Sequence, residues 1–186
     1  MKPKDLRTGD IIAFAAKKWL PRQIQKFMRL QARIKYHTKL PKYYNHTMTV
    51  TEPEEMKVAE AVARGFVNQN IWKHYSEEEL KDMIVFRLKE DLTGEEKQAL
   101  LSEAKELADK NIEYEVLNFI WWVFYILTNG KIDFSPKGSR QAKKLFCFET
   151  SAMLLIAARP GLFPDPSKVT TVDLQMDERF ENLYFD

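Results

Sequence analysis

The chain has 186 residues, of which 45% are hydrophobic and 12% aromatic, and its net charge at neutral pH is +2. This length and composition predict a single domain, residues 1–180, with one substantial core. The single cysteine excludes an internal disulfide framework, and the most apolar run, residues 119–127, is far shorter than the roughly 20 residues that a transmembrane helix needs.

The first third of the chain predicts a strand, a helix and a β-hairpin. After a glycine-aspartate turn, the apolar run 11–14 predicts a strand, and the helical spacing of apolar residues predicts a helix over 21–33. Apolar and polar residues alternate over 46–51 and again over 56–62, which is typical of half-buried strands. The proline-containing turn at 52–55 joins these two strands into a hairpin.

The rest of the chain predicts two more strands followed by helices. A threonine and a glutamate three residues apart, Thr93 and Glu96, form the capping box of one of these helices. A last, extended segment follows the final helix. The expected strands are 66–71 and 83–89, the expected helices are 94–110, 115–128 and 144–158, and the extended segment is 169–174.

The hairpin contains the first candidate site residues. Each strand has an apolar face with one polar residue in it, His46 on the first strand and Glu60 on the second. If the turn is centred near Pro53, the two lie opposite each other with Cβ atoms about 5 Å apart. Burial of an imidazole and a carboxylate is costly unless they satisfy each other, which favours a functional pair. A slip of one residue would instead expose Glu60 on the other face.

Cys147 lies near the start of an apolar helical run. The positive end of a helix dipole favours thiolate over thiol, and a nucleophilic cysteine needs a base together with a group that orients the base. Cys147, His46 and Glu60 fit the roles of nucleophile, base and orienting group. The alternative is that Cys147 is an inert, buried apolar residue.

Neither a metal nor another cofactor is expected. One cysteine and three scattered histidines match none of the usual zinc-ligand spacings. The sequence also lacks a glycine-rich phosphate loop.

The net charge hides a strongly basic region. Between Ile11 and Thr51 there is no acidic residue, whereas the stretch 17–42 carries nine lysines and arginines. Such a stretch predicts attraction to an anionic partner, such as phosphate, a lipid headgroup, a cell-wall polymer or nucleic acid. The alternative is a solvated helix face that the acidic stretch 90–115 neutralises in the fold.

The last six residues are set aside as the remnant of an expression tag. Residues 181–186 resemble a viral-protease cleavage site, although Asp186 stands where such a site has glutamine.

Five short motifs carry a resemblance to a known family. In chain order they contain a Gly-Asp strand, a strand that begins at a histidine, a strand with an acidic residue, a Cys-x-Glu helix start and a closing segment. They are Leu6–Ile12, Asn45–Val50, Val58–Ala61, Cys147–Glu149 and Val169–Leu174. Together they resemble the circularly permuted papain-like hydrolases, in the YiiX-like branch of the NlpC-type cysteine amidases. Two positions depart from the family pattern, because Asn45 and Phe148 stand where the family has serine.

This resemblance implies an α+β fold, a circularly permuted papain-like (NlpC-type) domain in which a small antiparallel sheet packs against helices. It implies a cysteine hydrolase that cleaves an amide or ester through a thioester acyl-enzyme, with a peptidoglycan-type peptide amidase or peptidase as the expected activity. Cys147, His46 and Glu60 would be the catalytic residues. Tyr114, similar to a family tyrosine, and Tyr44, beside His46, are the expected substrate-binding residues.

Two other functions remain open. One is a lipid-directed acyltransferase or deacylase of the same fold, and the other is a non-enzymatic anion-binding domain that uses the basic stretch 17–42. As an enzyme, the protein is expected to act as a monomer on a small-molecule, peptide or lipid-linked substrate. Peripheral membrane contact fits the charge pattern, and nucleic acid is not an expected partner. We expect a cytoplasmic protein as the sequence stands, or one of the cell envelope if a signal sequence has been removed.

Overall fold

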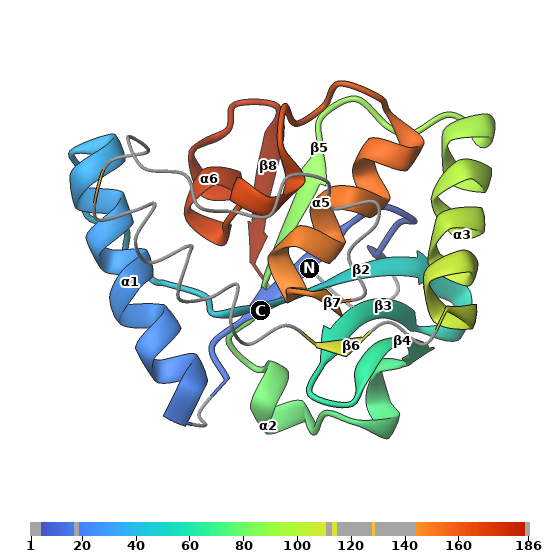
Figure 1. The fold of residues 1–186 in the computed structure, drawn as a ribbon, viewed down its shortest axis with the longest axis horizontal. Helices are drawn as coiled ribbons and strands as arrows, with labels where there is room; N and C mark the ends of the chain where they lie inside the picture. Colours follow the sequence, from blue (N-terminus) through green and yellow to red (C-terminus); the bar gives the residue numbers. More distant parts are fainter. Residues whose placement is uncertain (1–4, 17–18, 111–112, 115–127, 129–143, 185–186) are drawn as a thin grey trace.

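The computed structural model describes residues 5–16, 19–110, 113–114, 128 and 144–184 (Figure 1). Short 3-10 turns cover Pro53–Glu55, Ile71–Lys73 and Pro166–Lys168. The strands are β1 (Ile11–Phe14), β2 (His46–Glu52), β3 (Lys57–Val62), β4 (Gly65–Asn70), β5 (Ile84–Leu88), β6 (Glu113–Tyr114), β7 (Lys144–Leu145) and β8 (Phe180–Tyr184). The helices are α1 (Trp19–Tyr36), α2 (Glu77–Leu80), α3 (Gly94–Asp109), α5 (Cys147–Ala158) and α6 (Thr171–Met176).

The larger sheet has six strands in the order β4-β3-β2-β1-β5-β8, and all neighbouring strands are antiparallel. β1 lies inside this sheet and all four of its residues are buried, which explains its continuous apolar sequence. β6 and β7 form a separate, parallel pair. An antiparallel sheet packed against helices confirms the expected α+β class.

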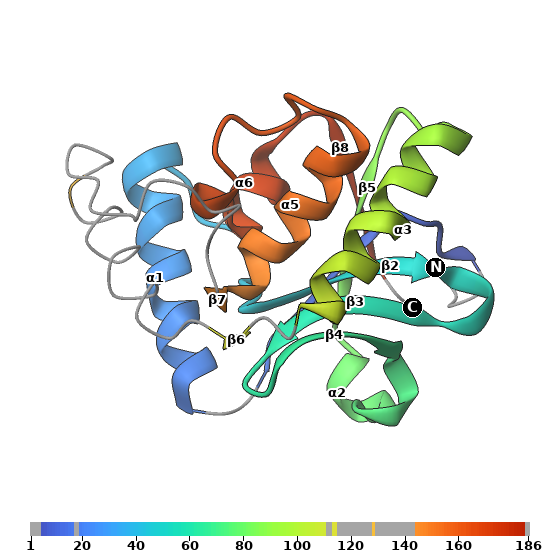
Figure 2. The ribbon, with the colours of Figure 1, turned by 45° about the vertical axis from the view of Figure 1, so that its right-hand side comes forward.

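Helices cover both faces of the six-stranded sheet. On one face α3 and α5 pack against β1, β3 and β5, and the residues that contribute include Leu100, Ala104 and Leu154. On the other face Leu80 of α2 lies in a second apolar cluster with Ile12 and Val58. Figures 1 and 2 show α3 and α5 on one side of the sheet, α2 on the other, and α1 at the far end of the molecule from α3. None of the described helices is long and apolar enough to span a membrane.

The helix predicted over 21–33 is α1, which is longer than expected at both ends. Pro21 lies in its first turn, where the missing backbone N–H has no intrahelical partner to lose. The inner face of α1 carries Ile24, Met28 and Ala32, all fully buried. Their spacing of four residues is the periodicity that predicted the helix.

The hairpin has a register that differs from the prediction. Thr49 pairs with Ala59, which places Glu60 opposite Met48 rather than opposite His46. The difference arises from a bulge near the end of β2 and from the 3-10 turn that follows it. Because the shift is two residues and not one, His46 and Glu60 still share a face of the sheet.

The Gly-Asp motif before β1 has a structural role. Gly9 adopts a φ of +93°, and a Cβ at this position would lie 2.6 Å from Leu92 Cδ1, so both the backbone and the packing require glycine. The Asp10 carboxylate is buried and accepts two hydrogen bonds from Arg87, at 2.9 and 2.6 Å. This ion pair joins the start of β1 to β5.

The prediction of an extended segment over 169–174 is wrong from Thr171 onward, where α6 begins. Thr170 accepts a hydrogen bond from Asp173 N, and the Asp173 carboxylate accepts one from Thr170 N, so that a capping box begins α6. The β-branched residues at 169–172 favour an extended segment, but the threonine–aspartate spacing determines the local structure.

The C-terminal segment 181–186 and the helix predicted over 115–128 lie partly or mostly outside the described residues. Within the segment set aside as a tag remnant, residues 181–184 belong to β8, which pairs with β5 at the edge of the sheet. The helix predicted over 115–128 lies outside the described residues, apart from residue 128.

Candidate active site

The start of β2 and the middle of β3 bring His46 and Glu60 together. His46 Nε2 lies 2.7 Å from Glu60 Oε2. The Glu60 side chain is fully buried, while that of His46 is 13% exposed. The imidazole of His46 is therefore anchored by a buried carboxylate and remains slightly exposed to solvent.

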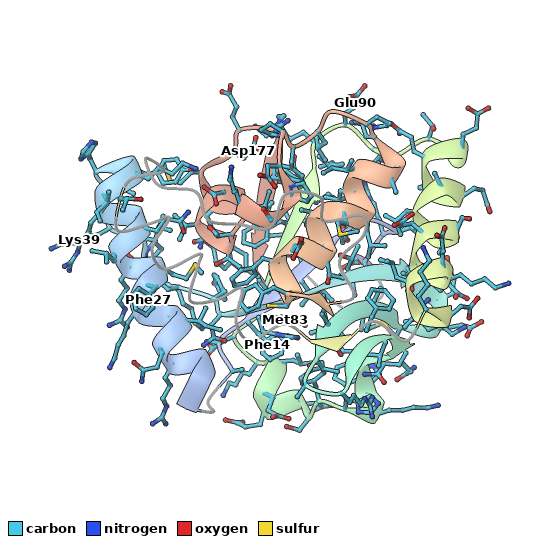
Figure 3. The ribbon with its side chains drawn as sticks, viewed as in Figure 1. Phe14, Phe27, Lys39, Met83, Glu90 and Asp177 are labelled. Atoms are coloured by element: carbon cyan, nitrogen blue, oxygen red, sulfur yellow. The ribbon has the colours of Figure 1, made fainter. Side chains whose placement is uncertain are left out.

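Glu60 has two further hydrogen-bond donors. Tyr75 Oη donates to Oε2 at 2.6 Å, and Gln69 Nε2 donates to Oε1 at 3.2 Å. Phe14 packs edge-on against both rings, with centroid distances of 5.2 Å to His46 and 5.0 Å to Tyr75; Figure 3 labels Phe14. A carboxylate with donors on both oxygens keeps its charge when buried, because each bond favours the ionised form.

Cys147 is the first residue of α5 and is 1% exposed. The helix is capped by the backbone of Phe146, whose side chain makes no capping hydrogen bond. The backbone N–H of Cys147 therefore lies outside the i to i−4 ladder of α5, at the positive end of the helix dipole.

Thr47, the neighbour of His46, fixes the start of α5 against β2. Its hydroxyl donates to the backbone oxygen of Cys147 at 2.9 Å and accepts from Ser151 Oγ at 3.1 Å. These two bonds hold the strand that carries the imidazole against the helix that carries the thiol.

The pKa of His46 reflects both partners. Burial alone lowers this pKa, but the interactions of the imidazole with Cys147 and Glu60 raise the pKa of His46 to about 10. Burial acts against ionisation of Glu60 as well, yet the hydrogen bonds from His46 and Tyr75 keep the pKa of Glu60 below its usual value. The Glu60 carboxylate occupies Nε2, so Nδ1 is the ring nitrogen that is not bonded to Glu60.

The structure thus brings Cys147, His46 and Glu60 together, and it places the two candidate tyrosines differently. Tyr44 is 1% exposed, lies in the core cluster under α5, and burial raises its pKa to about 12. Its ring is therefore a core element and not part of an open surface. The backbone of Tyr114, in β6, pairs with Leu145 of β7, two residues before Cys147.

Sequence reasoning missed Tyr75, Gln69 and Thr47. Tyr75 lies between a 3-10 turn and the capping box of α2, where no periodicity predicts the direction of a side chain. Thr47 lies on the strand face opposite His46, so the alternation that singled out His46 assigned the threonine to packing. Gln69 had a usable signal, because it lies on the same strand face as Val67, which pairs with Glu60 across β3 and β4.

Replacing Tyr75 by phenylalanine should raise the pKa of Glu60, because a hydrogen bond to the charged carboxylate is lost while the ring contact with Phe14 stays. The carboxyl carbon shift of Glu60, followed by NMR against pH, measures this change. Tyr36→Phe is the matched control, since it removes a tyrosine–carboxylate bond of 2.6 Å to Asp173. An unchanged Glu60 titration in Tyr75→Phe would contradict the assigned bond.

The described part of the chain contains no group of three or more His, Cys, Asp or Glu side chains that could hold a metal ion. His46 Nε2 and Glu60 Oε2 are bonded to each other and do not converge on a shared point. This donor set does not fit a metal centre.

Comparison with known proteins supports the fold. No protein-family model matches the chain, and neither does any curated protein. Among solved structures, the metalloprotein YiiX from Escherichia coli O157:H7 matches with a TM-score of 0.52 and 20% sequence identity. The match covers 82% of this chain and 66% of that chain, so the present chain spans slightly less than two thirds of the length of YiiX. The fold of this protein is YiiX-like.

Proposed function

We propose that this protein is a cysteine hydrolase that cleaves an amide or ester bond through a thioester acyl-enzyme. One observation carries the proposal: the buried Glu60 carboxylate hydrogen-bonds the His46 imidazole at 2.7 Å, and Cys147 lies near enough to the same imidazole to help raise its pKa. That arrangement is the nucleophile, base and orienting group that acyl transfer requires. A peptidoglycan-type peptide is the first substrate class to test.

In the acylation step, the Cys147 thiol gives its proton to His46, and the sulfur attacks the carbonyl carbon and forms a C–S bond while the carbonyl π electrons move to oxygen. The backbone N–H of Cys147, at the start of α5, would help to stabilise that oxyanion. When the tetrahedral intermediate collapses, the bond to the leaving amine or alcohol breaks, and the His46 imidazolium gives its proton to the leaving group.

In the deacylation step, neutral His46 accepts a proton from water as the water oxygen attacks the thioester carbonyl. The C–S bond then breaks, the acid product leaves and the proton returns to the Cys147–His46 pair. Glu60 keeps the imidazole in position through both steps and stabilises the imidazolium whenever it forms, without itself taking the proton.

Phe148, which stands where the family has serine, has a packing role in this structure. The Phe148 side chain is 2% exposed and packs with Met28 of α1, edge-on to Phe146 at a centroid distance of 5.1 Å. The position at which the family has serine is used here to attach α1 to the start of α5.

YiiX is described as a metalloprotein. Because the described donor set of this chain does not fit a metal centre, no step of the proposed reaction is routed through a metal.

A panel of thiol-reactive probes that carry either peptidyl or fatty-acyl groups tests the proposal. We expect covalent labelling of Cys147 at neutral pH, detected by intact mass, and loss of labelling in Cys147→Ala. His46→Ala should slow labelling by at least about tenfold, since the base is lost. The probe class that reacts faster identifies the acyl group. Labelling at the rate of an ordinary thiol, unchanged in His46→Ala, would rule out the Cys147–His46 pair.

A further inference from the structure

The solvent-exposed side of α1 carries positively charged side chains. Side chains are described for residues 22–36 of this helix, and every exposed one among them is lysine or arginine. They are Arg22, Lys26, Arg29, Arg33 and Lys35. No acidic residue lies between Ile11 and Thr51 to interrupt this surface.

Four of these cations form one line along the helix. Arg22, Lys26, Arg29 and Arg33 follow one another at steps of four, three and four residues, which keeps them within a sector of roughly 60° on a helix of 3.6 residues per turn. With a rise of 1.5 Å per residue, the line is about 16 Å long. Lys39, just beyond the helix, lies on the same outer side of the molecule (Figure 3). We call the four residues the α1 stripe.

The fold does not neutralise the α1 stripe with the acidic stretch 90–115. α3, which carries most of those carboxylates, lies at the opposite end of the molecule in both ribbon views (Figures 1 and 2). Glu96 of α3 pairs with Arg159, at 2.7 Å, and Glu106 with Lys110. The alternative of an internally neutralised helix face is therefore wrong for these carboxylates.

Within the described part of the chain, the ion pairs of this region involve other residues. Lys35, off the line, pairs with Asp173 at 2.7 Å, and Lys42 pairs with Asp82 at 3.1 Å. None of the four stripe residues forms an ion pair with a described carboxylate; Arg29 lies over the Tyr43 ring, 5.7 Å from its centroid. Four neighbouring like charges repel one another, and an external anion would relieve that repulsion.

The inner side of α1 connects the stripe to the candidate site. Ile24, Met28 and Ala32 lie in one apolar cluster with Cys147 and Phe148. Gln25 Nε2 also donates to the backbone oxygen of the buried Tyr43, at 2.8 Å. Side chains of α1 and of the start of α5 thus share one apolar cluster, which joins the helix that carries the stripe to the helix that carries the thiol.

We propose that the α1 stripe docks the protein on the surface of an anionic lipid bilayer. A line of cations along the outer side of α1 fits a plane of headgroups. The exposed positions between residues 22 and 36 offer no aromatic ring on which a base would stack, and the pI of about 8.5 is below the range typical of nucleic-acid-binding domains. Each cation near an anionic bilayer contributes to binding, and the contribution falls within a Debye length.

One consequence rests on the proposed function. A protein docked through α1 brings the candidate site to the bilayer surface, so an acyl group linked to an anionic lipid becomes a substrate class to test beside the peptides. Cys147→Ala should bind vesicles as the unchanged protein does, because the thiol is not part of the stripe. Loss of activity and loss of docking are therefore separable.

Sedimentation with vesicles tests the docking. The unchanged protein should bind phosphatidylcholine vesicles that contain about 30% phosphatidylglycerol, bind pure phosphatidylcholine weakly, and lose binding as salt rises from about 50 to about 300 mM. Replacing all four stripe residues by glutamine should weaken binding roughly 100-fold and flatten the salt dependence, with little change in melting temperature.

The matched control removes four exposed lysines elsewhere, Lys73, Lys81, Lys89 and Lys105, for the same change in net charge. It should keep most of the binding. Equal loss in both variants would show that overall charge, and not α1, attracts the vesicle, and so would overturn the proposal. Tighter binding of an oligonucleotide than of the anionic vesicles at equal salt would also overturn it and assign the stripe to nucleic acid.

Discussion

Cys147→Ala should abolish acyl transfer, and His46→Ala should lower kcat/KM by at least roughly 1000-fold. The alanine at 147 has no nucleophile, and the chain has no second cysteine that could substitute for it. The alanine at 46 leaves the sulfur without a base and leaves the carboxylate of Glu60 buried without its partner. Hydrolysis of the ester or amide that the probe panel identifies, followed under steady-state conditions, measures both effects.

His74→Ala is the control for His46→Ala, because His74 is exposed and contacts Arg64 rather than Cys147. It should keep nearly full activity. Cys147→Ala and the double change Cys147→Ala with His46→Ala should have the same residual rate, since residues that act as one unit are not additive. Activity that survives in Cys147→Ala would show that the thiol is not the nucleophile.

Most of the central sheet was predictable because its strands carry strong local signals. The alternation in β2 and β3 and the apolar runs of β1 and β5 gave the strands to within a residue or two, and the capping box at Thr93 gave the start of α3. α2 was missed because four residues are too short for periodicity. The pairing of β8 with β5 depends on tertiary contacts that no local pattern contains.

The candidate site was likewise predictable only where its geometry follows from a local sequence pattern. Which face His46 and Glu60 occupy follows from strand alternation, and that much was predictable. The two-residue difference in register was not predictable. It depends on a bulge, and no residue of β2 marks the position of that bulge. Tyr44 was expected to bind substrate from its place beside His46, but it precedes β2 and its ring lies in the core cluster. A residue that is close to a site residue in the sequence can still be buried in the core where a loop leads into a strand.

Glu60→Gln should lower kcat/KM partially, by roughly 10-fold to 100-fold at neutral pH, and the loss should grow as pH rises. Glutamine keeps the shape and can still accept a hydrogen bond, but it lacks the charge that helps to raise the pKa of His46 to about 10. A raised pKa means that the imidazolium, and the stability it contributes, is complete below the unfolded value near 6.5 and is lost as pH rises through about 10. In the variant the folded pKa moves back toward 6.5.

The decisive measurement is therefore the alkaline limb of the profile of kcat/KM against pH. In the unchanged protein this limb should fall near pH 10, where His46 loses the proton that the leaving group needs, and in Glu60→Gln it should fall at lower pH. Glu52→Gln, in the same hairpin but paired with Lys57 away from His46, should leave the limb in place. If Glu60→Gln lowers activity equally at every pH, the carboxylate holds the hairpin together without tuning the imidazole. Its part in the reaction would then be limited to positioning His46, and the charge that keeps the imidazolium would have to come from Cys147 alone.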